Sequence, residues 1–257
     1  MKVQNITLSI ANLSFSYTEK EKTVIRDVDI QIPRGSVTSL LGLNGSGKTT
    51  LLLLILGFLK PLEGEIRLDF NGESYPIERL NGSIGYLPQL ENIPFDYPVK
   101  EFILLGRSPR IKFFNLPGES DYKKVADIHN FLNLKEIENK KLHEISGGEL
   151  QRVRIARTLA QDPKIILMDE PMTHLDIKHK KYISDLLNAL GQQGRIVIYS
   201  THDPLDAIKN SDYCILLGKS MQAFSGKIKE LTNNNMLSKY FEMKLEIDND
   251  GNLVINE

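Results

Sequence analysis

Hydrophobic and polar residues alternate along residues 1–35 of the chain and again along residues 63–70. A period of two predicts strands with one buried face that pair in antiparallel fashion. Asn71-Gly72 follows one of these segments and is typical of a tight turn. The apolar positions of the pattern are Val3, Ile6, Leu8, Ile10, Leu13, Phe15, Tyr17, Val28, Ile30 and Ile32, and residues 63–70 continue it. Residues 84–87 are expected to form a further short strand that runs into Pro88-Gln89.

Two other segments, residues 165–168 and 196–199, are apolar without interruption, which is typical of strands buried on both faces of a parallel sheet. Residues 36–41 are also expected to form a buried strand. A nearly all-leucine stretch, residues 50–56, predicts a buried helix that stops at Gly57 and Pro61. Further helices are expected at 174–190 and 228–241, followed by a hairpin in which Leu245 and Ile247 face Leu253 and Ile255 across Asp250-Gly251. The fold class is therefore α/β.

Residues 92–135 have a different character. Residues 92–98 combine two prolines with Phe95 and Tyr97 and predict a surface loop. Helices are expected at 99–106 and 121–132, with irregular structure at 108–118. We therefore predict one domain over 1–257, with an α/β core at 1–92 and 163–257 and an inserted helical subdomain at 93–162.

Composition narrows the function classes. The chain has 257 residues and a net charge of −1, which gives no electrostatic footprint for nucleic acid. The single cysteine, Cys214, sits in an apolar run and is expected to be a buried thiol. No apolar run is long enough to span a bilayer, and the N-terminus has no signal-peptide pattern, so at a membrane something else must anchor the protein.

The chemistry centres on the stretch Gly42-Leu43-Asn44-Gly45-Ser46-Gly47-Lys48-Thr49, which fits the phosphate-binding pattern G-x-x-x-x-G-K-[ST]. Glycines allow main-chain N–H groups to approach a triphosphate closely. Lys48 adds a point charge at the β- and γ-phosphates, and the Thr49 hydroxyl can ligate Mg²⁺. A predicted strand precedes the loop, and a predicted helix that begins at Thr50 follows it. This order favours a phosphate-binding loop over a chance glycine-rich turn, which would lack both neighbours.

Two adjacent carboxylates, Asp169 and Glu170, follow the predicted strand at 165–168. Ligands of open α/β sheets bind at the carboxyl ends of strands. Asp169 can hold Mg²⁺ through its water shell, and Glu170 can orient or deprotonate an attacking water. Asp-Glu-Pro is also common at plain turns, so this pair alone leaves both interpretations open.

A second candidate anion site lies at Ser146-Gly147-Gly148-Glu149, ahead of a helix rich in apolar residues. Ser146 and Glu149 have the spacing of a capping box, so the segment could simply begin a helix. Alternatively, its two glycines and free N–H groups bind phosphate. Two anion sites for one triphosphate are explained by a dimer in which each helix caps the nucleotide of the other subunit.

In this order and spacing the motifs resemble those of ABC transporter nucleotide-binding subunits, over almost the whole chain. The resemblance implies a P-loop NTPase core with an antiparallel β subdomain and an inserted helical subdomain. It implies ATP hydrolysis with Mg²⁺, an aromatic Tyr17 that stacks on adenine and a histidine, His202, that contacts the γ-phosphate. The chain departs from the family pattern in two places. One is the segment 145–149, the family's signature segment, which here starts with Ile145 and ends in Glu149, and the other is the unusual stretch Met172-Thr173-His174.

The site residues that follow from the motifs and the resemblance fall into three groups. The catalytic group is Glu170, His202, Gln89 and Lys48. The nucleotide-binding group is Tyr17, Gly42, Asn44, Gly45, Ser46, Gly47, Lys48, Thr49, Thr50, Ser146, Gly147, Gly148, Glu149 and Asp176, and the metal group is Thr49, Gln89 and Asp169.

Residues 105–110 contain a Gly-Arg-x-Pro segment similar to that of ATPases serving importers of siderophore-bound iron, haem and cobalamin, and residues 231–241 resemble the same group. The segment could instead only turn the subdomain surface. The resemblance implies a homodimer of ATPase subunits on the cytoplasmic face of the cell membrane. Its partners would be permease subunits, with a substrate-binding protein for an importer.

Three rival readings come from other classes of ABC ATPase. The first is a soluble ABC ATPase without a permease, such as one in iron–sulfur cluster assembly. DNA-repair and chromosome ATPases carry a long coiled coil that is missing between Lys48 and Ser146. Translation-factor ABC proteins need two cassettes in one chain, and this chain has one.

Overall fold

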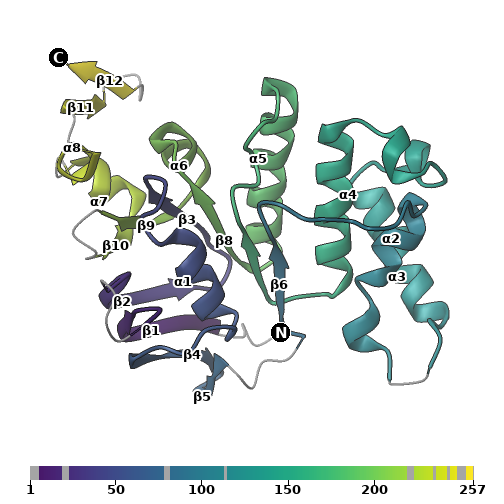
Figure 1. Ribbon diagram of the computed structural model, residues 1–257, viewed down its shortest axis with the longest axis horizontal. Coiled ribbons are helices and arrows are strands. Elements are labelled where there is room, and N and C mark those ends of the chain that lie inside the picture. The colour runs from purple at the N-terminus through teal and green to yellow at the C-terminus, as the bar shows by residue number, and fades with distance from the viewer. Residues whose placement is uncertain are drawn as a thin grey trace. The chain divides into compact units, whose positions relative to one another are not determined.

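The computed structural model describes residues 6–18, 23–77, 82–112, 115–218, 223–233, 236–241, 244–247 and 253–256. The chain forms two compact units (Figure 1). The first unit combines residues 1–80 with 184–257, and the second comprises residues 81–183.

The first unit contains the predicted antiparallel sheet. Its strands are β1 (Ile6–Phe15), β2 (Ile25–Pro33), β4 (Glu63–Phe70) and β5 (Glu73–Pro76), in the order β2-β1-β4-β5. Leu8 lies opposite both Ile32 and Leu68, and all three side chains are buried. The alternation in the sequence is thus confirmed as one buried face, while Val3 lies outside the described residues.

A parallel sheet follows in the same unit. Strand β3 (Val37–Gly42) pairs in parallel with β8 (Ile196–Thr201) and with β9 (Tyr213–Leu217), and β10 (Ala223–Lys227) is antiparallel to β9. Every residue of β3 and β8 is buried, including the polar residues Thr38, Ser39, Ser200 and Thr201, so both predicted buried strands are confirmed. Cys214 is a buried free thiol in β9, and burial raises its pKa to about 12.

The helices of this unit are α1 (Lys48–Ile55), α6 (Pro204–Asn210), α7 (Ile228–Asn233) and α8 (Met236–Phe241). The helix expected over 228–241 is described as two helices. The predicted hairpin is confirmed in β11 (Lys244–Ile247) and β12 (Leu253–Asn256), with Leu245 opposite Ile255 and Ile247 opposite Leu253. Its turn at Asp250-Gly251 lies outside the described residues.

The second unit combines two parallel strands with three helices. Strand β6 (Ile84–Leu87) pairs with β7 (Ile165–Met168), and the helices are α2 (Val99–Leu105), α3 (Glu119–Phe131) and α4 (Gly147–Ala160). Short 3₁₀ turns are η2 (Ser108–Arg110), η3 (Lys135–Ile137) and η4 (Leu142–Glu144). Within the described part of the chain, no helix is both long and apolar enough to cross a membrane.

Among the predicted helix starts, that of α5 differs most from the structure. Helix α5 (Ile177–Gln192) runs from the second unit into the first and begins three residues after the expected start at His174. His174 has a φ of 62°, in the left-handed region, which a helix excludes. Asp176 is the residue that caps α5, because its Oδ1 accepts the main-chain N–H of His179 at 2.8 Å.

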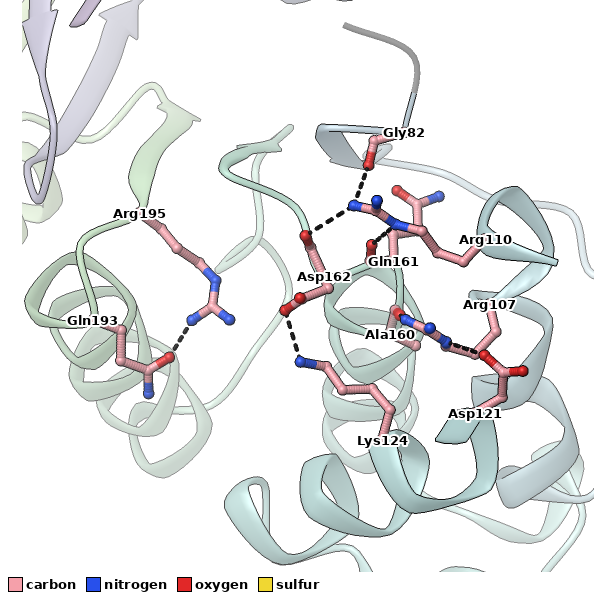
Figure 2. Close-up of polar contacts among 10 residues, drawn as sticks. All are labelled: Gly82, Arg107, Arg110, Asp121, Lys124, Ala160, Gln161, Asp162, Gln193 and Arg195. Carbon is pink, nitrogen blue, oxygen red and sulfur yellow. Dashed lines mark hydrogen bonds and ion pairs between the residues drawn. The ribbon is translucent and has the colours of Figure 1, made fainter. Parts of the chain in front are cut away.

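The Gly-Arg-x-Pro segment closes the C-terminal end of α4 (Figure 2). Arg107 donates from Nη1 to the Ala160 carbonyl at 2.7 Å and from Nε to Asp121 at 2.8 Å. Arg110 donates to the carbonyls of Gln161, Asp162 and Gly82. Cations at a helix C-terminus satisfy its last carbonyls and interact favourably with the helix dipole.

Gly106 is required by close packing at the same place. A Cβ on this residue would lie 2.1 Å from the Arg157 carbonyl oxygen, inside α4. We predict that Gly106→Ala lowers the free energy of unfolding by about 1–3 kcal/mol, because main-chain atoms must shift to admit the methyl group. Urea unfolding followed by circular dichroism measures this.

The matched control is Gly147→Ala at the other end of α4, where a Cβ would meet no atom within 4 Å. Its unfolding free energy should stay within about 0.5 kcal/mol of wild type. Equal losses for the two variants would contradict the packing argument at Gly106.

Candidate nucleotide and catalytic site

The predicted phosphate loop connects β3 to α1 in the first unit. Gly45 and Gly47 have φ values of 78° and 94°, which favour glycine. A Cβ on Gly42 would lie 2.5 Å from Ser46 Oγ and 2.7 Å from the Leu217 carbonyl oxygen. The three glycines of the motif are therefore each required by main-chain geometry or by space.

The polar groups of the loop are arranged to receive an anion. Lys48 is buried, and its Nζ donates to the carbonyls of Gly42 at 2.9 Å and Leu43 at 3.1 Å. Ser46 Oγ is a buried hydroxyl oxygen that has no hydrogen-bond partner among the described residues. Thr49 lies exposed in the first turn of α1, a turn without acidic residues. An unsatisfied hydroxyl, a lysine and a helix N-terminus together fit a phosphate group.

Tyr17 and His202 belong to the same unit as the phosphate loop. Tyr17 is 55% exposed as a residue. Its ring packs edge-on against Phe15, and its hydroxyl forms a 3.0 Å hydrogen bond with Thr50 Oγ1. His202 is exposed and directly follows β8. Because Leu41 and Thr201 are neighbours in parallel strands, the phosphate loop and His202 leave the same edge of the sheet.

The second unit brings Gln89 and Glu170 into contact. Glu170 Oε2 accepts hydrogen bonds from Gln89 Nε2 at 3.3 Å and from Thr173 Oγ1 at 2.9 Å. The main chain of Glu170 has a φ of 46°, a conformation that costs energy for a residue with a side chain. Such strain, directly after a buried strand, is frequent at functional sites.

Asp169 precedes Glu170 at the end of β7. It is only 3% exposed, and its main-chain N–H donates to the Leu87 carbonyl at 2.8 Å. Burial and the nearby Asp169 charge raise the pKa of Tyr86 to about 12. The side chain of Asp169 is a carboxyl group at the strand end, which is a suitable ligand type for Mg²⁺.

The segment 146–149 forms the predicted capping box at the N-terminus of α4. Ser146 Oγ accepts the Glu149 N–H at 3.3 Å, and Glu149 Oε2 accepts the N–H and the hydroxyl of Ser146, both at 2.8 Å. These hydrogen bonds hold the pKa of Glu149 below its usual range. Glu149 therefore retains the capping role that its position predicts.

His179 is a residue whose role the sequence did not reveal. The sequence suggests that it lies on a solvated helix face, but its ring covers Gly148, where a Cβ would lie 2.3 Å from His179 Cδ2. Its Nδ1 lies 2.8 Å from Asp176 Oδ1. His179 thus links Asp176 to Gly148, and the one sign of this in the sequence is that a residue without a side chain stands at position 148.

The aromatic loop before α2 differs in part from expectation. Phe95 is 65% exposed, as predicted. Tyr97 is partly buried, because its ring packs against Phe95 and Phe102 with centroid distances of 5.9 and 6.3 Å. A cavity of about 1050 Å³ adjoins this loop, and α2 forms one of its walls through Lys100, Glu101, Leu104 and Leu105.

Comparisons with known proteins agree with this arrangement. The profile of the ABC transporter family matches residues 25–173. The chain is 33% identical to the molybdate import ATP-binding protein of Haemophilus influenzae, over 92% of this chain and 88% of that protein. It is 34% identical to a petrobactin import ATP-binding protein of Bacillus anthracis, over 90% and 86%.

A solved structure described as a metal-chelate type ABC transporter, in an inward-facing conformation, has the same fold. The TM-score is 0.83 at 30% sequence identity, covering 98% of this chain and 96% of that one. The phosphate loop, the Gln89–Glu170 contact and the capping box thus occur in a chain that matches this family over most of its length. The chain belongs to the ABC transporter family, as an ATP-hydrolysing subunit of the importer type.

Proposed function

We propose that two copies of this subunit close around two Mg-ATP and drive a membrane permease that imports an iron–siderophore complex or a related metal chelate, haem or cobalamin. The observation that carries the catalytic part is the Glu170 carboxylate. It lies in a strained main-chain conformation with Gln89 and Thr173 bonded to it. A carboxylate fixed in this way can orient or deprotonate an attacking water.

The remaining roles follow from the chemistry of each group. Lys48 and the loop N–H groups bind the β- and γ-phosphates, His202 contacts the γ-phosphate, and Tyr17 stacks on adenine. Thr49, Asp169 and Gln89 carry a hydroxyl, a carboxylate and an amide oxygen, which are ligand types that Mg²⁺ accepts, and these residues would hold the metal. The metal would neutralise charge that develops on the phosphates.

Dimerisation follows from the second anion site. The N-terminus of α4, with Ser146 and Gly147, would receive the γ-phosphate bound to the other copy, beside Asp176. Glu149 keeps this terminus in place through the capping box. In this proposal, an α/β core comprises residues 1–92 and 163–257, and a helical subdomain comprises residues 93–162.

The permease would dock on the cavity walled by α2, which Tyr97 lines, and on the exposed Phe95 that packs against Tyr97. Its lining mixes apolar side chains such as Leu104, Val125 and Ile111 with charged ones such as Lys100 and Glu138, as expected for a helix-binding groove. Such docking would hold the subunit at the cytoplasmic face of the membrane. The chelate class is supported by the relative that is a petrobactin import ATP-binding protein. A substrate-binding protein would accompany such an importer.

The first prediction concerns catalysis. Glu170→Gln keeps the size of the side chain but removes the base, so ATP turnover should fall roughly a hundredfold or more while ATP binding persists. Steady-state phosphate release and equilibrium binding of a fluorescent ATP analogue measure the two properties. Glu136→Gln, at an exposed position of η3, is the control and should hydrolyse ATP at the wild-type rate. Wild-type turnover by Glu170→Gln would remove Glu170 as the base.

The second prediction concerns the dimer. In the Glu170→Gln background, Ser146→Arg should prevent ATP-dependent dimerisation, measured by light scattering, because a bulky side chain fills the proposed γ-phosphate position. Binding of ATP by the monomer should remain. Loss of the helix cap costs about 0.5–2 kcal/mol, so folding is checked by thermal melting. Ser120→Arg, on an exposed face of α3, is the matched control and should dimerise. Dimers that still form with Ser146→Arg would contradict the two-site arrangement.

The third prediction concerns the permease. Phe95→Glu should leave the ATPase rate of the isolated subunit within about twofold of wild type but prevent assembly or transport in reconstituted vesicles, because a charge would enter an apolar contact. Tyr97→Glu should do the same, with an added stability loss from its packing on Phe102.

Phe58→Glu is the control for the docking surface. Phe58 is 74% exposed and belongs to the other compact unit. This variant should assemble and transport normally. Normal transport by Phe95→Glu would exclude this loop as the docking surface, and a wild-type protein that binds no membrane protein would favour a soluble ABC ATPase.

A further inference from the structure

A largely buried ionic cluster fastens the segment around Gln89 to helix α4. Glu91 pairs through Oε2 with Arg154 Nε at 3.2 Å and through Oε1 with Arg157 Nη2 at 2.5 Å. The three side chains are 17%, 11% and 22% exposed. At this burial the charges are poorly screened by water, so the pairing constrains geometry more than an exposed pair does.

Arg154 also reaches both sides of the Gln89–Glu170 pair. Its Nη2 donates to the carbonyl of Pro88 at 2.6 Å, next to Gln89 in sequence. Its Nη1 donates to Gln151 Oε1 at 2.8 Å, and Gln151 Nε2 donates to the carbonyl of Pro171 at 2.9 Å, next to Glu170 in sequence. The Arg154 guanidinium thus binds the main chain next to Gln89 directly, and it binds the main chain next to Glu170 through the side chain of Gln151.

The chemistry of these groups suits a positioning role. A guanidinium presents five donors in a rigid plane, so the directions toward Glu91, Pro88 and Gln151 are fixed relative to one another. The two carbonyls that accept these hydrogen bonds belong to prolines, Pro88 and Pro171. Because the ring of a proline fixes its φ, the main chain next to Gln89 and Glu170 has fewer conformations available. The Gln89–Glu170 contact itself is long, at 3.3 Å, and depends on main-chain placement from both sides.

We propose that Arg154 is a positioning residue, which with Glu91 and Gln151 sets the distance and orientation of Gln89 and Glu170 for hydrolysis. The inference rests on the catalytic roles proposed above for those two residues. Arg154 lies on the same helix whose N-terminus carries Ser146. The helix that would meet the nucleotide of the other copy is therefore also the helix that holds the water-activating pair.

The test compares steady-state ATP hydrolysis by the full chain for wild type, Arg154→Met, Arg154→Lys and Gln151→Leu. Arg154→Met should lower kcat at least tenfold and leave the KM for ATP within threefold, since misplacement by about 1 Å can cost a hundredfold in rate. Arg154→Lys should recover little, because an ammonium cannot direct three fixed bonds. Gln151→Leu, which frees only the Pro171 side, should give an intermediate loss of kcat.

The matched control is Arg110→Met. Arg110 also donates to three main-chain carbonyls, those of Gln161 and Asp162 at the C-terminal end of α4 and that of Gly82 (Figure 2). This variant should shift the melting temperature and leave kcat near the wild-type value. All rates are taken well below the lowest melting temperature and divided by the number of sites that bind a fluorescent ATP analogue. Partial unfolding therefore cannot imitate a loss of kcat.

The double variant Glu91→Gln with Arg154→Met adds a second measurement. If the two side chains act as one unit, the double variant should lose no more kcat than Arg154→Met alone. A kcat for Arg154→Met within twofold of wild type, or a loss equal to that of Arg110→Met, would overturn the inference. If Glu170→Gln also kept wild-type turnover, the proposed function would fail as well. A Glu170→Gln variant without activity beside a fully active Arg154→Met would overturn the positioning role alone.

Discussion

A main chain can bind a polyanion only where several of its N–H groups are free to donate to the anion. In a buried strand these N–H groups already donate to neighbouring strands. The phosphate loop resolves this conflict by leaving β3 at its last residue, Gly42, where there is no space for a side chain. The parallel partners of β3 are completely or almost completely buried, so the edge from which the loop emerges cannot shift without disturbing the core. The position of His202 at the same edge depends on this fixed strand.

Helix α4 plays the corresponding part in the second unit. A capping box satisfies its first N–H groups, and arginines from the segment 106–110 satisfy its last carbonyls. In its middle, Arg154 and Arg157 share Glu91, and Arg157 also lies over the Phe102 ring of α2 at 4.5 Å. A single rigid element therefore contacts the loop of Gln89, the residue after Glu170 and the wall of the cavity. Force applied at α2 would reach the carboxylate through packed groups rather than through a mobile linker.

Local signals in the sequence predicted most elements. The strands at 63–70, 84–87 and 165–168 have the expected bounds, because their periodicity and turn residues act over a few positions. The sequence predicted less well those features that depend on tertiary contacts. Because His174 has a left-handed main-chain conformation, α5 begins later in the sequence than expected. Tyr97 is partly buried because its ring packs against Phe102. The ion pair between Glu91 and Arg154 joins residues 63 positions apart, which no spacing rule marks. The chemical motifs were readable because phosphate chemistry fixes their residue types, whereas the groups that support them are fixed only by packing.

The chemistry of Cys214 has a practical consequence. The protein has one cysteine, and it is fully buried in β9, where burial keeps the thiol protonated at neutral pH. Maleimide and similar reagents attack the exposed thiolate, so the native protein should be nearly inert to them. A cysteine introduced at an exposed position such as Phe95 or Ser120 would then be the one reactive thiol per chain. Spectroscopic labels and distance probes can be attached at chosen positions without first removing a native residue from the core.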